Sequence, residues 1–176
     1  ASQGAGGPKD EATAALYYKK SLQTWKKEAD DGDSKAALWA ALVYERKLVP
    51  DSSPEKSVPY LLQAAESGNL TAQGLLAFKY RDGLGVPQDA AKAVEWFEKA
   101  ASRKDLGAVM ELGIMFRDGK YLPPDREKAF HWFEKGAEWK DPYSMAALAD
   151  MLLEGTPSAE QAARALALYR EAAAAG

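Results

Sequence analysis

The sequence predicts an all-α protein, a solenoid built from helix-turn-helix repeats. Three observations support this prediction. The chain repeats itself with a period of 36 residues. Each repeat holds two stretches with apolar residues at helical spacing, separated by a short turn. A helix-capping residue recurs at the start of every first stretch, at Asp33, Asn69, Asp105 and Asp141. A fixed period of this size is typical of stacked helical repeats.

The clearest self-similarity aligns residues 72–101 with residues 108–137 without a gap. Trp96-Phe97-Glu98-Lys99, for example, falls on residues 132–135. The period extends both ways to four repeats, about 33–68, 69–104, 105–140 and 141–176. One step earlier, Trp25, Ala29 and Gly32 occupy equivalent positions, which indicates a half repeat ahead of the first full one.

The repeated residues resemble the Sel1-like repeat, an α/α solenoid unit related to the tetratricopeptide repeat. Repeat two follows the pattern A-x3-L-[GA]-x2-[YF]-x2-G-x-G-V-x2-D-x2-K-A-x2-W-[YF]-x-K-A-A through nearly its whole length. Repeat three has Tyr121-Leu122 for the Gly-Val pair, and repeat one has Lys47 for the first glycine. The resemblance covers roughly residues 20–176. It implies a right-handed α/α superhelical solenoid that serves as a scaffold, and it does not point to one chemistry.

We expect residues 1–9 to be a disordered linker, because they are small, polar and rich in glycine. Residues 10–176 are expected to form one repeat domain that opens with a capping helix over 10–31. The first helix of each later repeat is termed helix A and the second helix B. The expected helices are 34–46, 54–67, 70–82, 90–103, 106–118, 126–139, 142–154 and 159–175.

Two sets of equivalent positions predict details of the backbone. Small residues recur where helix A and helix B should approach closely, at Ala41, Ala77, Gly113 and Ala149. Gly32 and Gly68 should end helices in the left-handed conformation, and their equivalents in later repeats are Lys104 and Lys140. We therefore expect these two lysines to have positive φ or a locally altered turn, with a strain of about 1 kcal/mol.

Composition excludes several classes of function. The formal net charge of -3 gives no reason to expect nucleic-acid binding. The chain has no cysteine, which removes disulfides and thiol chemistry. The sequence also contains no apolar run long enough to span a membrane. These observations leave the compartment open between cytoplasm and periplasm.

Residues capable of chemistry are few, and none forms a convincing site. The single histidine, His131, lacks ligand partners at helical spacing, so we expect a helix B histidine half-covered by the next repeat. Ser53 and Lys56 form a Ser-x-x-Lys string, but Ser53-Pro54 is the pattern of a helix start, and no companion motif follows. Recurrent aspartates, read as caps and turn residues, give no calcium site. We expect no catalysis, no cofactor and no metal.

The analogy with the tetratricopeptide repeat implies that helix A residues line a concave, partner-binding face. The predicted contact residues are Lys35, Leu38, Leu42, Glu45, Arg46, Phe78, Arg81, Met110, Ile114, Arg117, Tyr143 and Asp150. Their apolar strip beside arginines suits an amphipathic helix or an extended peptide with carboxylates. In the alternative interpretation, Phe78 and Ile114 pack between helices, and the arginines pair with Asp82, Asp118 and Glu45.

Three large aromatic residues break the repeat and are candidate secondary contacts: Trp39, Tyr121 and Trp139. Local packing is an equally good interpretation of Trp139. The last helix ends in an alanine-rich tail without a polar capping helix. Either the chain is a fragment of a longer array, which we favour, or its end face packs on another chain, as in a weak dimer.

The function predicted from these features is a non-catalytic scaffold or adaptor that binds another protein. A more specific alternative is an immunity or inhibitor protein that neutralises one bacterial toxin or enzyme. A β-lactam-related hydrolase is a third hypothesis, which the missing nucleophile–base pair opposes. The family resemblance implies a bacterial setting, with the periplasm or envelope favoured over the cytoplasm.

Overall fold

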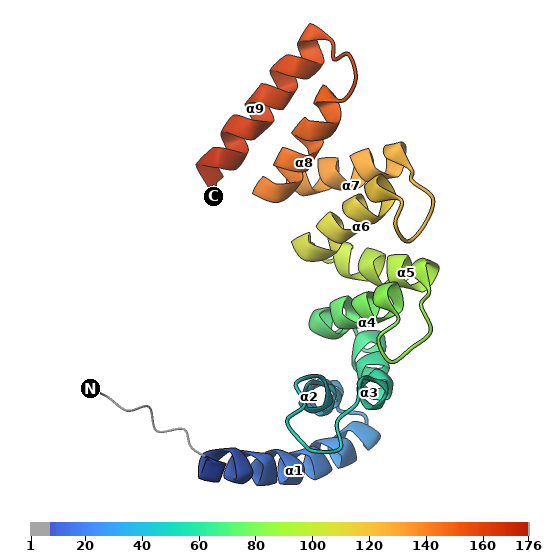
Figure 1. Ribbon diagram of the computed structural model, residues 1–176, viewed down its shortest axis with the longest axis vertical. Helices are drawn as coiled ribbons and strands as arrows, with labels where there is room; N and C mark the ends of the chain where they lie inside the picture. The colour runs from blue at the N-terminus through green and yellow to red at the C-terminus, as the bar shows by residue number, and fades with distance from the viewer. Residues whose placement is uncertain (1–7, 176) are drawn as a thin grey trace, which may run out of the picture. The chain divides into compact units, whose positions relative to one another are not determined.

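The computed structural model describes residues 8–175, with side chains from residue 12 onward, and this part of the chain is all-helical (Figure 1). Its nine helices are α1 (Pro8–Asp30), α2 (Ser34–Glu45), α3 (Pro54–Glu66), α4 (Leu70–Asp82), α5 (Ala90–Ala101), α6 (Leu106–Asp118), α7 (Arg126–Glu138), α8 (Pro142–Leu153) and α9 (Ala159–Ala175). The all-α prediction is confirmed, and the expected helix boundaries differ from these by at most two residues. Residues 1–7, most of the predicted linker, lie outside the described residues.

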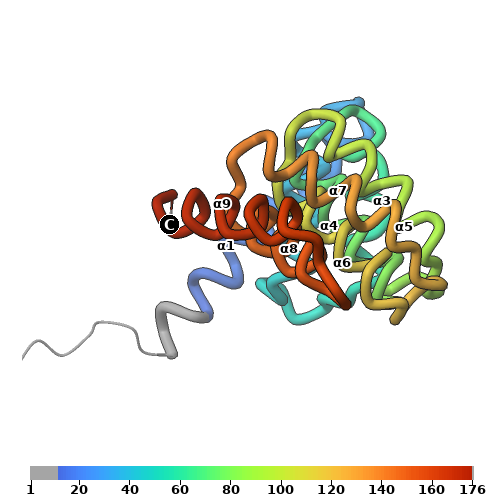
Figure 2. The backbone as a smooth tube through the Cα atoms, turned by 90° about the horizontal axis from the view of Figure 1, so that it is seen from above, coloured from blue at the N-terminus to red at the C-terminus, as the bar shows by residue number. Residues whose placement is uncertain are grey.

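The helices group into two compact units, Ala1–Ala93 and Val94–Gly176, with the division inside α5. In the first unit, α1 packs on α2, α2 on α3 and α3 on α4. In the second unit, α6 packs on α7, α7 on α8 and α8 on α9 (Figures 1 and 2). In these pairs a helix A packs on the helix B that follows it, as α2 on α3, or a helix B packs on the next helix A, as α7 on α8. The prediction of one continuous domain over 10–176 remains a prediction.

Side-chain caps start the A helices as the sequence predicts. The Oδ1 of Asp33 accepts from the amides of Lys35 and Ala36, at 2.8 and 3.0 Å. Equivalent single bonds of 2.7 to 3.1 Å join Asn69 to Ala72, Asp105 to Ala108 and Asp141 to Ser144. These bonds satisfy amides of the first helical turn that have no partner within the helix. Each repeat therefore begins its helix A at the same position of the 36-residue period, and the cap at that position depends only on neighbouring residues.

The starts of the B helices differ from one another. Asp89 and Asp125 each cap the amide three residues on, at 3.0 Å. The amide of Lys128 thereby lowers the pKa of the Asp125 carboxyl. The expected cap at Ser53 is wrong in its chemistry: Ser53 takes the N-cap conformation before Pro54, but its side chain makes no capping bond. The Ser53 hydroxyl instead interacts with the carboxylate of Glu55 and lowers its pKa.

The start of α9 is a reciprocal capping box. The Ser158 amide donates to Gln161 Oε1 at 2.8 Å, and the Gln161 amide donates to Ser158 Oγ at 3.2 Å. Two amides without helical partners are satisfied by one pair of side chains.

The small residues at the centre of each helix pair have the predicted packing role. Ala41, Ala77 and Ala149 are fully buried. A Cβ added to Gly113 would lie 2.6 Å from Cδ1 of Phe133, which is itself fully buried. The ring of helix B therefore rests directly on the backbone of helix A in this repeat, and there is no room for a methyl group.

The predicted positive φ at two lysines is confirmed. Lys104 and Lys140 both have φ of 63°, at the positions where Gly32 and Gly68 have φ of 98° and 84°. A third lysine follows the same rule, which we did not anticipate. Lys47 has φ of 53° at the position of Gly83, Gly119 and Gly155, which are all left-handed as well. The backbone of the repeat thus keeps this conformation whether or not glycine is present.

Candidate protein-interaction surface

The predicted contact residues all lie at or near the surface of their own units. The first unit carries seven of them on α2, its C-cap Arg46, and α4, and the second unit carries five on α6 and α8. None of them is buried, whereas Ala40, Leu76, Leu112 and Leu148 of the same helices are fully buried. The apolar members Leu38, Leu42, Phe78, Met110 and Ile114 are half-buried. They therefore combine partial packing within the helix array with a surface open to solvent.

Arg81 is held in place by two neighbours. Its Nε and Nη2 donate to the two carboxylate oxygens of Asp82 at 2.9 and 2.7 Å. Its guanidinium carbon also lies 4.7 Å from the centroid of the Phe78 ring. This combination fixes the planar guanidinium group over an apolar surface, which reduces the entropy that a partner would have to remove.

Arg117 repeats this arrangement in the second unit. Its Nε donates to Asp118 Oδ1 at 2.7 Å, and its guanidinium carbon lies 5.6 Å from the Phe133 ring. The pairing of both arginines with the following aspartates, one of our two alternatives, is confirmed. Each Arg-Asp pair offers both hydrogen-bond donors and acceptors, so these arginines do not present an isolated positive charge to a partner.

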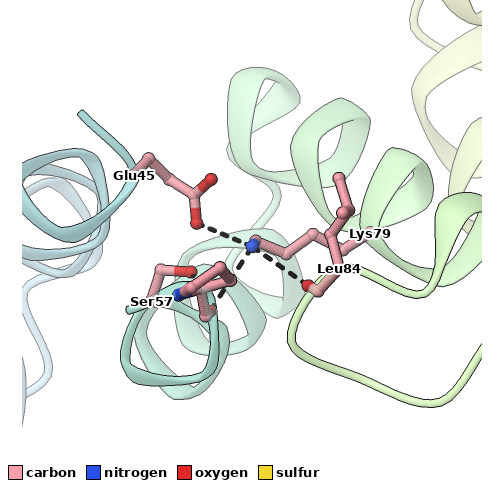
Figure 3. A network of polar contacts seen from close by, with 5 residues as sticks. Glu45, Ser57, Lys79 and Leu84 are labelled. Carbon is pink, nitrogen blue, oxygen red and sulfur yellow. Dashed lines mark hydrogen bonds and ion pairs between the residues drawn. The ribbon is translucent and has the colours of Figure 1, made fainter. Parts of the chain in front are cut away.

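Glu45 does not pair with an arginine, and this part of the alternative is wrong. Its Oε1 lies 2.7 Å from Nζ of Lys79, a side chain only 4% exposed (Figure 3). The same ammonium donates to the carbonyl oxygens of Leu84 at 3.2 Å and Pro54 at 3.4 Å. The Ser57 hydroxyl donates to Pro54 as well, at 2.6 Å. The network joins the end of α2, the start of α3 and the loop after α4.

Sequence reasoning missed Lys79 and Ser57, although the repeat comparison contained the signal. Lys79 replaces the apolar residues Val43, Met115 and Met151, and Ser57 replaces Ala93, Ala129 and Ala165. All of these positions are buried. A polar residue in a position that is apolar in every other repeat indicates a local network between repeats one and two.

The loop after α4 fits tightly against the same network. Gly85 has φ of 77°, and a Cβ there would lie 2.6 Å from the carbonyl carbon of Pro54. Only glycine combines this backbone conformation with so close an approach. The Gly-Leu-Gly turn thus has a packing role at this junction.

The three aromatic candidates have different surroundings. Trp39 is 51% exposed and stacks on Trp25 of α1, with ring centroids 6.0 Å apart. Tyr121 is half-buried, with the Lys120 ammonium 4.7 Å from its ring centroid. Trp139, the C-cap of α7, is half-buried between the ammonium groups of Lys104 and Lys135. Trp39 therefore offers the most open aromatic surface of the three.

Tyr143 and Asp150 lie on α8 in the second unit. The Tyr143 side chain is 75% exposed. Asp150 accepts a hydrogen bond from the Tyr169 hydroxyl of α9, and this bond raises the pKa of Tyr169. Asp150 thus has a structural partner, whereas Tyr143 extends into solvent.

The residues considered for chemistry do not assemble into a catalytic or metal site. Lys56 pairs with Asp51 and donates to its carbonyl oxygen at 3.0 Å, so it does not activate Ser53. His131 is exposed beside Trp132, and our expectation of a half-covered histidine is wrong. Within residues 8–175, no three His, Asp or Glu side chains form a group that could hold a metal ion.

The repeats, the paired helices and the conserved geometry of their turns define the class: the chain belongs to the Sel1 repeat family. The model of this family, described as the Sel1 repeat, matches residues 2–23, 35–69, 71–105, 107–138 and 142–176. The last four matches correspond to our four repeats. The first match ends before Trp25, whereas buried Ala29 and left-handed Gly32 support the half repeat that we placed there.

Solved structures that are similar to this chain include two repeat proteins. One is c5321, a protective antigen of uropathogenic Escherichia coli strains with the same repeat fold, at 29% identity and a TM-score of 0.74 over 88% of this chain. This chain spans 33% of that protein. The other is a Sel1 repeat protein from Oxalobacter formigenes, at 25% identity and a TM-score of 0.77, covering 97% of this chain and 74% of that one. A search of curated proteins finds no match.

One further finding concerns membranes. None of the helices described between residues 8 and 175 is both long and apolar enough to cross a bilayer.

Proposed function

We propose that this chain is a non-catalytic adaptor that binds a partner protein through the outward positions of its A helices. The observation that carries the proposal is the same in both units. Apolar side chains of helix A stay partly exposed next to an arginine that its neighbouring aspartate and an aromatic ring hold in place. Such a surface offers apolar contact area and oriented donors, which suits a peptide or helix with carboxylates.

The exposed Trp39, stacked on Trp25, extends this surface in the first unit. Large aromatic side chains that are held rigid lose little entropy on binding and are frequent hot spots. In the second unit, exposed Tyr143 has the corresponding role. We propose both as anchors, with Tyr121 and Trp139 as secondary contacts.

We further propose a bacterial envelope setting. The support comes from the E. coli relative, which is described as a protective antigen. If the partner proves to be a single toxin or enzyme whose activity is blocked on binding, the adaptor is an inhibitor, the narrower of the two functions.

Site-specific photo-crosslinking tests the proposal in each unit separately. A photoreactive phenylalanine analogue replaces Leu42 in α2 or Ile114 in α6, and matched controls replace the exposed B-helix residues Glu66 in α3 and Glu138 in α7. We expect an adduct with the same protein at the two A-helix positions and none at the controls. Adducts confined to the B-helix positions would overturn the proposal.

A further inference from the structure

The first helix, α1, carries a small patch of residues on the side that faces solvent. On its other side, Leu22 is buried, and Tyr18 and Trp25 pack against the same cluster of core residues. We use the name α1 patch for four exposed residues: Leu16, Tyr17, Lys19 and Lys20. Leu16 is 58% exposed and Tyr17 is 64% exposed. The patch therefore joins two apolar side chains to two cations.

Lys20 lies at a position that is basic in every repeat. Steps of 36 residues from Lys20 reach Lys56, Lys92, Lys128 and Arg164. In each of these four repeats the cation has a carboxylate partner. The pairs are Lys56–Asp51, Lys92–Asp89, Lys128–Asp125 and Arg164–Glu134. Among residues 12–175, the ammonium group of Lys20 has no such partner.

The missing partner of Lys20 has a simple cause in the sequence. Lys92 and Lys128 each pair with the aspartate three residues earlier, at N–O distances of 3.6 and 3.5 Å. The residue three before Lys20 is Tyr17, which has no carboxylate. Nor does an acidic residue occur between positions 12 and 27, about two helical turns on either side of Lys20. The α1 patch thus has no counter-charge of its own.

The position of Lys20 stays open to solvent even where a helix A lies on both sides of a helix B. Three steps of the period lead from Lys20 to Lys128 and from Tyr17 to Asp125. These two residues belong to the start of α7, which packs on both α6 and α8. Their side chains nevertheless remain 61% and 36% exposed. The accessibility of Lys20 and Tyr17 therefore does not depend on what lies next to α1.

The apolar residues of the patch indicate what kind of molecule supplies the carboxylate. Tyr17 lies edge-on to Tyr18, with ring centroids 5.7 Å apart, and Leu16 is one turn from Lys20. A protein partner can match this pattern with an acidic and an apolar side chain on neighbouring turns. A lipid surface fits less well, because a helix that lies on a membrane needs an apolar face along its length. Leu22 and Trp25, further along α1, pack against the core instead.

We propose that the α1 patch docks an acidic α-helix of a partner protein. A carboxylate of that helix pairs with Lys20, in the place that Asp89 has beside Lys92. An apolar side chain one turn away on the same helix packs on Leu16 and Tyr17. The patch is separate from the helix A positions of the proposed function, and the proposal does not rest on them.

The probe is a fluorescent, hydrocarbon-stapled peptide with leucine in its first helical turn and glutamate on the same face of each later turn. Its binding to the full chain is followed by fluorescence anisotropy at low ionic strength, and the control peptide has glutamine for glutamate. In the protein, Lys20→Glu is compared with Lys92→Glu, the same charge change at the equivalent exposed position of α5. A third variant, Tyr17→Asp, gives Lys20 an internal partner. Circular dichroism and thermal unfolding check that all three variants keep the fold.

We expect wild type to bind the glutamate peptide and not the glutamine peptide. Lys92→Glu should change the affinity by less than about twofold, because that lysine is not part of the patch. Lys20→Glu and Tyr17→Asp should each weaken binding by about fivefold or more, the first by repulsion and the second by competition for Lys20. No binding to wild type, or equal effects of Lys20→Glu and Lys92→Glu, would overturn the proposal.

Two further measurements, made without peptide, test other occupants of the α1 patch. In sedimentation velocity, a wild-type dimer that Lys20→Glu converts to a monomer would show that a second copy of the chain binds the patch. In cosedimentation with phosphatidylserine vesicles, binding that Lys20→Glu abolishes would show that an anionic lipid surface binds it. Either result would overturn the proposal of a partner helix.

Discussion

The buried ammonium of Lys79 lies 2.7 Å from the carboxylate of Glu45, although every other repeat has an apolar residue in place of the lysine. Two carbonyl oxygens, of Pro54 and Leu84, complete the surroundings of the ammonium. A charge taken out of water needs such partners to be tolerated. The ion pair therefore makes the junction of repeats one and two chemically different from the others.

Removing Glu45 alone should lower the free energy of unfolding more than replacing both Glu45 and Lys79. We expect Glu45→Ala to lower the free energy of unfolding by about 3 kcal/mol, because it leaves the ammonium buried without a counter-charge. Adding Lys79→Met, the residue of repeats three and four, should recover most of this loss. Urea denaturation measures both, with exposed Glu66→Ala as a control expected within about 0.5 kcal/mol of wild type. A double variant less stable than Glu45→Ala would contradict this account.

Gly113 and Gly74 are both helical glycines, and replacing each with alanine should change the free energy of unfolding in opposite directions. Gly113→Ala places a methyl group against the buried ring of Phe133, and we expect a loss of about 1–3 kcal/mol. A Cβ on Gly74 meets nothing within 4 Å, so Gly74→Ala should gain about 0.5–1 kcal/mol from helix propensity. Equilibrium unfolding of the two variants measures both changes in the free energy of unfolding. Equal effects would show that the helix pair can adjust its spacing at Gly113.

Replacing a lysine that has positive φ with glycine should relieve the strain in its backbone. Lys104→Gly removes the strain of φ 63° and should raise the free energy of unfolding by about 0.5–1 kcal/mol. Glu98→Gly, on an exposed face inside α5, is the matched control and should lower it by about 1 kcal/mol. Thermal and urea unfolding of both variants provide the comparison. If Lys104→Gly destabilises as much as Glu98→Gly, the lysine carries no strain.

The hydrogen bond from Tyr169 to Asp150 should show a defined pH dependence. It raises the pKa of Tyr169 in the folded state above that of the unfolded chain, near 10. The stabilisation is therefore present below about pH 10 and is lost as the pH rises through the folded-state pKa. Carbon-13 NMR of labelled tyrosine should show that Asp150→Ala lowers the pKa of Tyr169. An unchanged pKa would mean that the bond does not form in solution.

Much of the fold could be predicted because its determinants are local and recur. The caps at Asp33 and Asn69, the left-handed positions at Lys104 and Lys140, and the capping box at Ser158 each depend on a few neighbouring residues. Their recurrence at one period fixes the helix boundaries. The resemblance to the Sel1 repeat then added the pairing of the helices, which local signals alone do not specify.

The interaction surface could be predicted only in part, because side-chain pairing depends on contacts between helices. The pairing of Arg81 with Asp82 involves adjacent residues and was one of our alternatives. The partner of Glu45 lies on another helix, and the repeat comparison marks Lys79 as an unusual polar residue without identifying Glu45 as its partner. The exposure of His131 likewise depends on which side of α7 the next helix covers.

Affinity capture with paired charge variants tests the central claim, that the A helices bind the partner. The bait is wild type, Arg81→Glu/Arg117→Glu, or the control Lys27→Glu/Arg103→Glu, which makes the same charge change at exposed residues on α1 and in the turn after α5. We predict that one protein is recovered by wild type and by the control, and is lost with Arg81→Glu/Arg117→Glu. Recovery of that protein by all three baits would contradict the account.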